Sequence, residues 1–112
     1  MNNVNIIIPV YNEAENIRRV IERIEAVVTM PHTIAVVYDT EEDTTIPVVR
    51  DMQKTLHGIE PVKNKYGRGP LNAIKTGLEA ASGTYALVTM ADLSDPPEVM
   101  NALYERAEAE HA

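Results

Sequence analysis

Val4-Asn5-Ile6-Ile7-Ile8-Pro9-Val10, followed directly by Tyr11-Asn12-Glu13, is the stretch that decides the fold class. Its apolar residues are nearly continuous and mostly β-branched, which is typical of a strand covered on both faces. Runs at 33–38 and 85–90 have the same character, and a weaker one covers 59–63. Because such strands occur mainly in α/β proteins, we expect four strands in a parallel sheet.

Helical patterns separate the predicted strands. After the first strand, Asn12 is a candidate N-cap, with Glu15 completing a capping box. Apolar residues then recur at spacings of three and four, which predicts one stripe facing the sheet. The stripe consists of Ile17, Val20, Ile21, Ile24, Val27 and Val28.

Three more helices follow the later strands. The second should begin near Pro47 and stop before Gly58, and the fourth should open at Asp95. The third should run from Pro70 to the Ser82-Gly83 pair. Its predicted buried residues are Leu71, Ile74 and Leu78.

This alternation of strands and helices predicts a single three-layer α/β/α domain spanning residues 1–112. The expected strand order is 3-2-1-4, with a topological switch between strands 1 and 4. Ligands of such sheets bind outside the carboxyl ends of the strands at the switch.

Composition narrows the classes of function. The chain has 112 residues, no cysteine and a net charge of −7. The charge argues against binding nucleic acid, and the missing thiols exclude disulfides and thiolate metal sites. Without a signal peptide or a membrane-spanning run, we expect a cytoplasmic protein, which in a longer form would act at the cytoplasmic face of the membrane.

Four polar clusters follow the four strands, at 11–13, 39–43, 63–69 and 92–95. Any one of them could simply cap a helix and stay solvated. Parallel strands, however, bring all four to one edge of the sheet, and this convergence predicts a binding site.

Two of the clusters indicate a ligand class. Asp92 and Asp95 offer hard oxygen ligands for Mg²⁺ or Mn²⁺, although Asp95 could instead cap the fourth helix. Lys63, Lys65 and Arg68 precede a helix N-terminus, a position that favours phosphate. Gly67-Arg68-Gly69 lacks the context of a dinucleotide fingerprint, because it follows the third strand rather than the first.

The motifs resemble family 2 glycosyltransferases, which have the GT-A fold. The resemblance is carried by residues 6–17, by the glycine-rich segment 64–77 and by 91–98, where Asp92-Leu93-Ser94-Asp95-Pro96-Pro97-Glu98 is similar to the dolichol-phosphate-mannose-synthase-like branch. It implies sugar transfer from a nucleotide-diphosphate sugar, with inversion, to an acceptor such as a polyprenyl phosphate or a glycan.

The resemblance also implies residue roles. Pro9, Tyr11 and Glu13 would line the nucleoside pocket, Asp39 would bind the base, and Asp92 would hold the metal. Gly67 and Arg68 would lie along the nucleotide. Two positions depart from the family pattern: Tyr38-Asp39-Thr40-Glu41 replaces Asp-Asp-Gly-Ser, and Met90 replaces the first Asp of Asp-x-Asp.

The family's catalytic base and acceptor site belong to its second half. We therefore expect a truncated, donor-binding domain with no catalytic residue of its own, and self-association through the edge of strand 4. A non-catalytic nucleotide-binding or interaction module is the alternative. A receiver domain is disfavoured, because Glu13 stands alone after strand 1 and a late Lys is missing.

Overall fold

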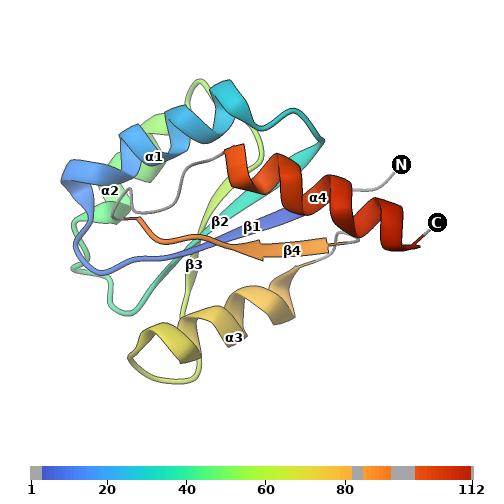
Figure 1. Cartoon of the computed structure of the whole chain (residues 1–112). Coiled ribbons are helices and arrows are strands. Elements are labelled where there is room, and N and C mark those ends of the chain that lie inside the picture. Colours follow the sequence, from blue (N-terminus) through green and yellow to red (C-terminus); the bar gives the residue numbers. More distant parts are fainter. Residues whose placement is uncertain (1–3, 82–84, 92–97, 112) are drawn as a thin grey trace.

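The computed structural model describes residues 4–81, 85–91 and 98–111. Strands and helices alternate along the chain. They are β1 (Val4–Pro9), α1 (Ala14–Val27), β2 (His32–Tyr38), α2 (Thr45–Met52), β3 (Ile59–Lys63), α3 (Pro70–Ala80), β4 (Tyr85–Val88) and α4 (Glu98–His111). The strands form one parallel sheet in the order β3-β2-β1-β4, which confirms the predicted topology (Figure 1).

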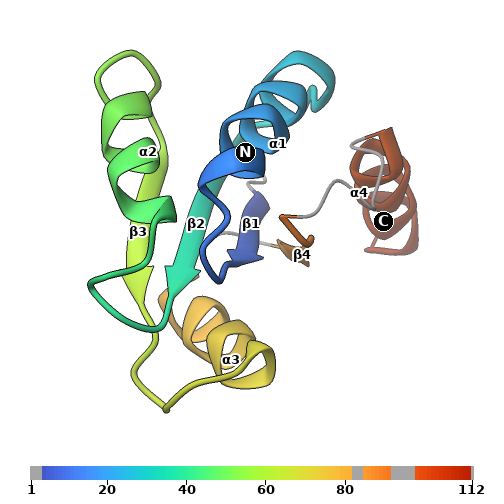
Figure 2. The same ribbon diagram turned by 90° about the vertical axis from the view of Figure 1, so that its left-hand side faces the viewer.

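Helices cover both faces of the sheet. α1 and α2 lie on one face and α3 on the other (Figure 2). α4 lies on the α1 side, where the ring of Tyr104 meets that of Tyr85 edge to face, with centroids 5.7 Å apart. The Asn101 side chain binds the C-terminal end of α1 and the loop that follows, at the carbonyl of Val27 (2.9 Å) and the N–H of Thr29 (3.1 Å). The three-layer prediction is confirmed.

The core follows from the pattern of β1. Ile6 and Ile8 face the α1 layer, and Ile7 faces α3; all three are fully buried. The predicted stripe of α1 packs onto the first of these faces, with only Val27 half-buried. β4 differs from the prediction, because Val88 is 42% exposed and the strand is covered on one face only.

The predicted buried face of α3 is wrong for both leucines, whereas Ile74 is half-buried. Leu71 is 81% exposed and Leu78 49%, whereas Ala73, Thr76 and Gly77 face the sheet. The reason is close approach: a Cβ at Gly77 would lie 2.5 Å from Cγ2 of Ile7. Only small side chains fit between this helix and the strands.

The predicted capping box of α1 is also wrong. The N-cap is Glu13 and has no side-chain cap hydrogen bond. Asn12 instead adopts a left-handed conformation (φ 50°), and its Oδ1 accepts the N–H of Thr44, 3.0 Å away. α2 begins at Thr45, two residues before the predicted start, and ends at Met52 rather than beside Gly58. No helix of the described residues is long and apolar enough to cross a membrane.

Candidate functional site

A cavity of about 480 Å³ opens at the carboxyl ends of β1 and β4, where the strand order reverses. This is the position at which parallel α/β sheets bind ligands. Loops after all four strands contribute to it. Its lining consists of Pro9, Val10, Tyr11, Glu13, Asp39, Arg68, Gly69, Pro70, Ala73, Met90 and Ala91.

Most of the predicted site residues meet in this cavity. Pro9, Tyr11 and Glu13 line it from the end of β1, Asp39 from the end of β2, and Arg68 from the loop before α3. The structure thus brings together residues up to 59 positions apart in sequence, from Pro9 to Arg68.

The remaining predicted residues are not part of this lining. Gly67 lies one residue before Arg68, with a positive φ of 101°, and is not among the lining residues. Asp92 and Asp95, the predicted metal ligands, lie outside the described residues.

Asp39 is held by a buried amide that sequence reasoning did not assign. Asn64, 7% exposed, donates from Nδ2 to the Asp39 carboxylate (2.9 Å) and to the carbonyl of Gly67 (2.7 Å). Its Oδ1 accepts from the hydroxyl of Thr76, 3.0 Å away on α3. The available signals were a polar residue directly after a strand and a threonine on the small-residue face of a helix.

Of the basic cluster, only Arg68 faces the cavity. Lys63 lies 3.5 Å from the carboxylate of Glu41, and Lys65 lies 3.4 Å from that of Glu79. Among the described residues, no acidic side chain forms an ion pair with Arg68. Its guanidinium is therefore the cation available to a phosphate at this pocket.

A smaller electrostatic cluster flanks the loop before α3. The Tyr66 hydroxyl bonds the Glu79 carboxylate, which raises the pKa of Tyr66 and lowers that of Glu79. Lys75 lies 4.3 Å from the centroid of the Tyr66 ring. These contacts attach the loop to the outer face of α3, away from the cavity lining.

The two departures from the family pattern have different consequences. Tyr38 is 6% exposed and packs in the core on the α1 side of the sheet, so its replacement of an aspartate leaves Asp39 in the cavity. Met90 lines the cavity and is 40% exposed. There the change substitutes a thioether for a carboxylate.

The residues that the structure describes do not form a metal site. No group of three His, Asp or Glu side chains able to hold a cation occurs within 4–81, 85–91 and 98–111. The cavity offers Glu13 and Asp39, together with Met90, whose soft sulfur is a poor ligand for Mg²⁺ or Mn²⁺.

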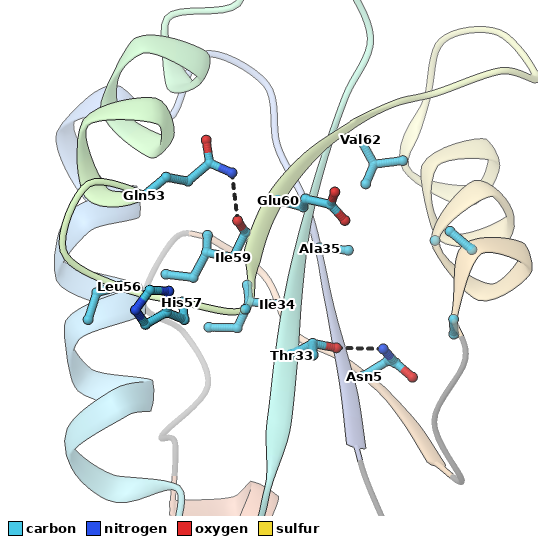
Figure 3. A pocket seen from close by; sticks show the side chains of 14 residues that line it. Asn5, Thr33, Ile34, Ala35, Gln53, Leu56, His57, Ile59, Glu60 and Val62 are labelled. Atoms are coloured by element: carbon cyan, nitrogen blue, oxygen red, sulfur yellow. Dashed lines mark hydrogen bonds between the residues drawn. The ribbon is translucent and has the colours of Figure 1, made fainter.

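A second cavity, of about 470 Å³, lies at the opposite end of the sheet, near the first residues of β1 and β2 (Figure 3). The described residues of its lining include Glu60, with its carboxylate, and no Lys or Arg. Gln53 closes one side by donating to the carbonyl of Ile59, 2.8 Å away. With this charge the cavity is a poor site for a phosphate.

Curated proteins with similar sequences are glycosyltransferases. A dolichol-phosphate mannosyltransferase from Pyrococcus furiosus is 33% identical over 103 residues, covering 91% of this chain and 29% of the relative. An undecaprenyl-phosphate 4-deoxy-4-formamido-L-arabinose transferase from Yersinia enterocolitica is 34% identical over 110 residues, covering 94% and 33%. The chain thus spans about a third of the length of these relatives.

Solved structures have the same fold. The mannosyltransferase PcManGT from Pyrobaculum calidifontis, in complex with GDP-Man and Mn²⁺, is 28% identical with a TM-score of 0.75, covering 89% of this chain and 31% of that one. S. aureus TarS 1-349 has a TM-score of 0.80 at 19% identity, covering 97% and 33%. The sheet is that of GT-A glycosyltransferases. The family model for glycosyl transferase family 2 matches residues 5–112, and the chain belongs to that family.

Proposed function

We propose that this chain is the donor-binding part of a glycosyltransferase that moves a sugar from a nucleotide-diphosphate sugar to an acceptor. The observation that carries the proposal is the cavity at the switch point, where Asp39 and Arg68 lie among apolar walls. The similar mannosyltransferase structure contains GDP-Man, which supports a nucleotide-sugar ligand.

The cavity has separate groups for the nucleoside and the diphosphate of such a donor. Pro9, Val10 and Ala73 offer apolar surface to a base, and the Asp39 carboxylate can accept hydrogen bonds from base or ribose. Arg68 can pair with the diphosphate. The N-terminus of α3, with Gly69 and Pro70 in the lining, adds the positive end of a helix dipole.

A divalent cation and a lipid-linked acceptor are the finer parts of the proposal. The Mn²⁺ in the similar mannosyltransferase structure supports a divalent cation. In this chain Asp92 and Asp95 would hold it, and it would neutralise negative charge on the diphosphate. The relatives' names specify dolichol phosphate and undecaprenyl phosphate, which supports a polyprenyl phosphate acceptor.

Calorimetric titration with GDP and UDP, each with and without Mn²⁺, tests the proposal. Binding of at least one nucleotide is expected, and Asp39→Ala should weaken it by roughly 10- to 150-fold, since a hydrogen bond to a charged group contributes about 1.5–3 kcal/mol. Glu60→Ala, in the other cavity, is the matched control. A folded chain that binds neither nucleotide contradicts the proposal.

We also propose that the 112-residue chain pairs with a second copy through β4. Among the strands that the structure describes, β4 is hydrogen-bonded to β1 alone, and it has neither Pro nor Lys. The other edge strand, β3, carries Pro61 and Lys63, which discourage pairing. Antiparallel pairing of two β4 strands about a two-fold axis would satisfy both edges and close the assembly.

A further inference from the structure

The segments that follow β1 and β2 are joined by hydrogen bonds, in which side chains of each segment accept backbone N–H groups of the other. The Asn12 N–H donates to the two carboxylate oxygens of Asp43, at 3.1 and 3.2 Å. In return, the Thr44 N–H donates to Oδ1 of Asn12, at 3.0 Å. A fourth bond runs from the Glu13 N–H to Oγ1 of Thr45, at 2.8 Å. These contacts join segments more than thirty residues apart.

Asp43 is buried at this junction, with 5% of its surface exposed. No Lys, Arg or His forms an ion pair with it within the part of the chain that the structure describes. Its carboxylate instead accepts backbone N–H groups, from Asn12 and from Thr45 (2.8 Å). A buried carboxylate is costly unless donors surround it, so this geometry is specific for an aspartate.

The junction determines the path of the loop that lines the nucleotide cavity. Asn12 has a φ of 50°, a left-handed conformation that is uncommon outside glycine and in which asparagine is enriched among the other residues. It lies between Tyr11 and Glu13, and both of these line the cavity. Tyr11 is 72% exposed, so its own packing does not hold it in place. The hydrogen bonds that Asn12 makes with Asp43 and Thr44 therefore fix the backbone at this point, and with it the direction in which the side chains of Tyr11 and Glu13 project.

We propose that Asp43 and Asn12 are positioning residues for the nucleotide pocket, acting through the backbone of Tyr11 and Glu13. The inference rests on the proposed function, because it assigns these residues a part in binding the same ligand. A capping role for Asp43 at the start of α2 explains its bond to Thr45. It does not explain the bonds across to Asn12.

The test compares Asp43→Ala, Asp43→Asn and the control Asp51→Ala, which removes an exposed carboxylate from α2, the helix that follows Asp43. GDP and UDP affinities are measured by calorimetry, and exchange of the Asn12 amide hydrogen is followed by NMR. For Asp43→Ala we expect affinity to fall at least about tenfold and amide exchange to rise by a similar factor, while amides of α3 are unchanged. Asp43→Asn, which keeps one acceptor oxygen, should be intermediate, and Asp51→Ala should match the wild type.

Wild-type affinity in a folded Asp43→Ala chain would overturn the positioning role and leave the proposed function intact. If the wild-type chain binds neither nucleotide, the proposed function fails and this inference fails with it. Should Asp43→Ala not fold, Asn12→Gly and Asn12→Ala decide. Glycine adopts the positive φ without strain, whereas alanine adopts it only at a cost. Nucleotide binding that is weaker in Asn12→Ala than in Asn12→Gly supports the positioning role. Wild-type affinity in both variants refutes it.

Discussion

Gly77→Ala tests the close contact that places α3 against the sheet. A Cβ at this position would lie 2.5 Å from Cγ2 and 3.1 Å from Cγ1 of Ile7, whereas carbon atoms in contact are normally about 3.5–4.0 Å apart. Ile7 is fully buried and packs with Val37 and Ala73, so it has little room to move. The helix must therefore shift outward by about 1 Å.

The change in the free energy of unfolding that Gly77→Ala causes is the difference between two opposing contributions. Overpacking a core of this kind costs about 1–3 kcal/mol. Replacing glycine by alanine in a helix stabilises the folded state by about 1 kcal/mol. We expect a net destabilisation of about 1 kcal/mol, which lowers the Tm of a domain of this size by about 4 °C.

A double-mutant cycle with Ile7→Ala isolates the contact. Ile7→Ala alone should cost about 2–5 kcal/mol, because it leaves a cavity. In that background Cγ1 and Cγ2 are gone and the remaining Cβ of residue 7 lies 3.3 Å away, so Gly77→Ala should become stabilising by up to about 1 kcal/mol, a reversal of sign. Guanidinium unfolding followed by circular dichroism measures all four chains, and Lys75→Ala on the exposed side of α3 serves as the control.

The result that refutes this reasoning is a Gly77→Ala chain more stable than the wild type, with no coupling to Ile7. The contact between Gly77 and Ile7 also matters for the ligand, because the N-terminal end of the same helix lines the cavity with Gly69, Pro70 and Ala73. An outward shift of α3 should therefore weaken nucleotide binding as well.

Three further predictions concern charge and the sheet edge. Arg68→Gln should weaken nucleotide binding about tenfold and flatten its dependence on salt, and calorimetry at low and high ionic strength would show an unchanged salt slope if Arg68 has no part. Val88→Lys should leave the fold intact and keep the chain monomeric; light scattering that finds a 12.4 kDa wild-type monomer at high concentration would contradict pairing through β4. The Arg18 hydrogen bond and then the charge of Lys54 lower the pKa of Asp51 below its ordinary value of 3.8. These two interactions therefore stabilise the fold fully above pH 3.8, and the stabilisation is lost as the pH falls through the lowered pKa. In Arg18→Gln, NMR titration should find the pKa of Asp51 closer to 3.8.

The order of the layers followed from patterns that act locally. Continuous β-branched runs at β1 and β2 and the stripe from Ile17 to Val28 each determine one element and its buried face. The right-handed crossover rule then allows few arrangements, and the observed order is the expected one. The location of the site at the strand ends follows from the same topology, which is why Tyr11, Glu13, Asp39 and Arg68 could be expected to lie together, whereas Pro9 was implied by the resemblance to the family.

Only tertiary structure decided which groups are paired and which are available. Lys63 and Lys65 look equivalent to Arg68 along the sequence, but partners on other elements, Glu41 and Glu79, hold them elsewhere. Asn12 has the sequence signature of a helix cap, yet it binds the neighbouring loop because Asp43 and Thr44 lie within reach. These hydrogen bonds and ion pairs depend on distances of a few ångströms between residues far apart in the chain. The local periodicity of the sequence predicts which face of an element is buried, but it does not predict those distances.

The buried face of α3 shows the same division. Leu71, Ile74 and Leu78 are its large apolar residues, and apolarity alone would bury all three, but only Ile74 is even half-buried. The spacing between helix and sheet, however, is set by the contact of Gly77 with Ile7, which admits small side chains and turns the leucines outward. Composition determines how much apolar surface a helix has, while the shape of the opposing strand determines which part of that surface fits against it.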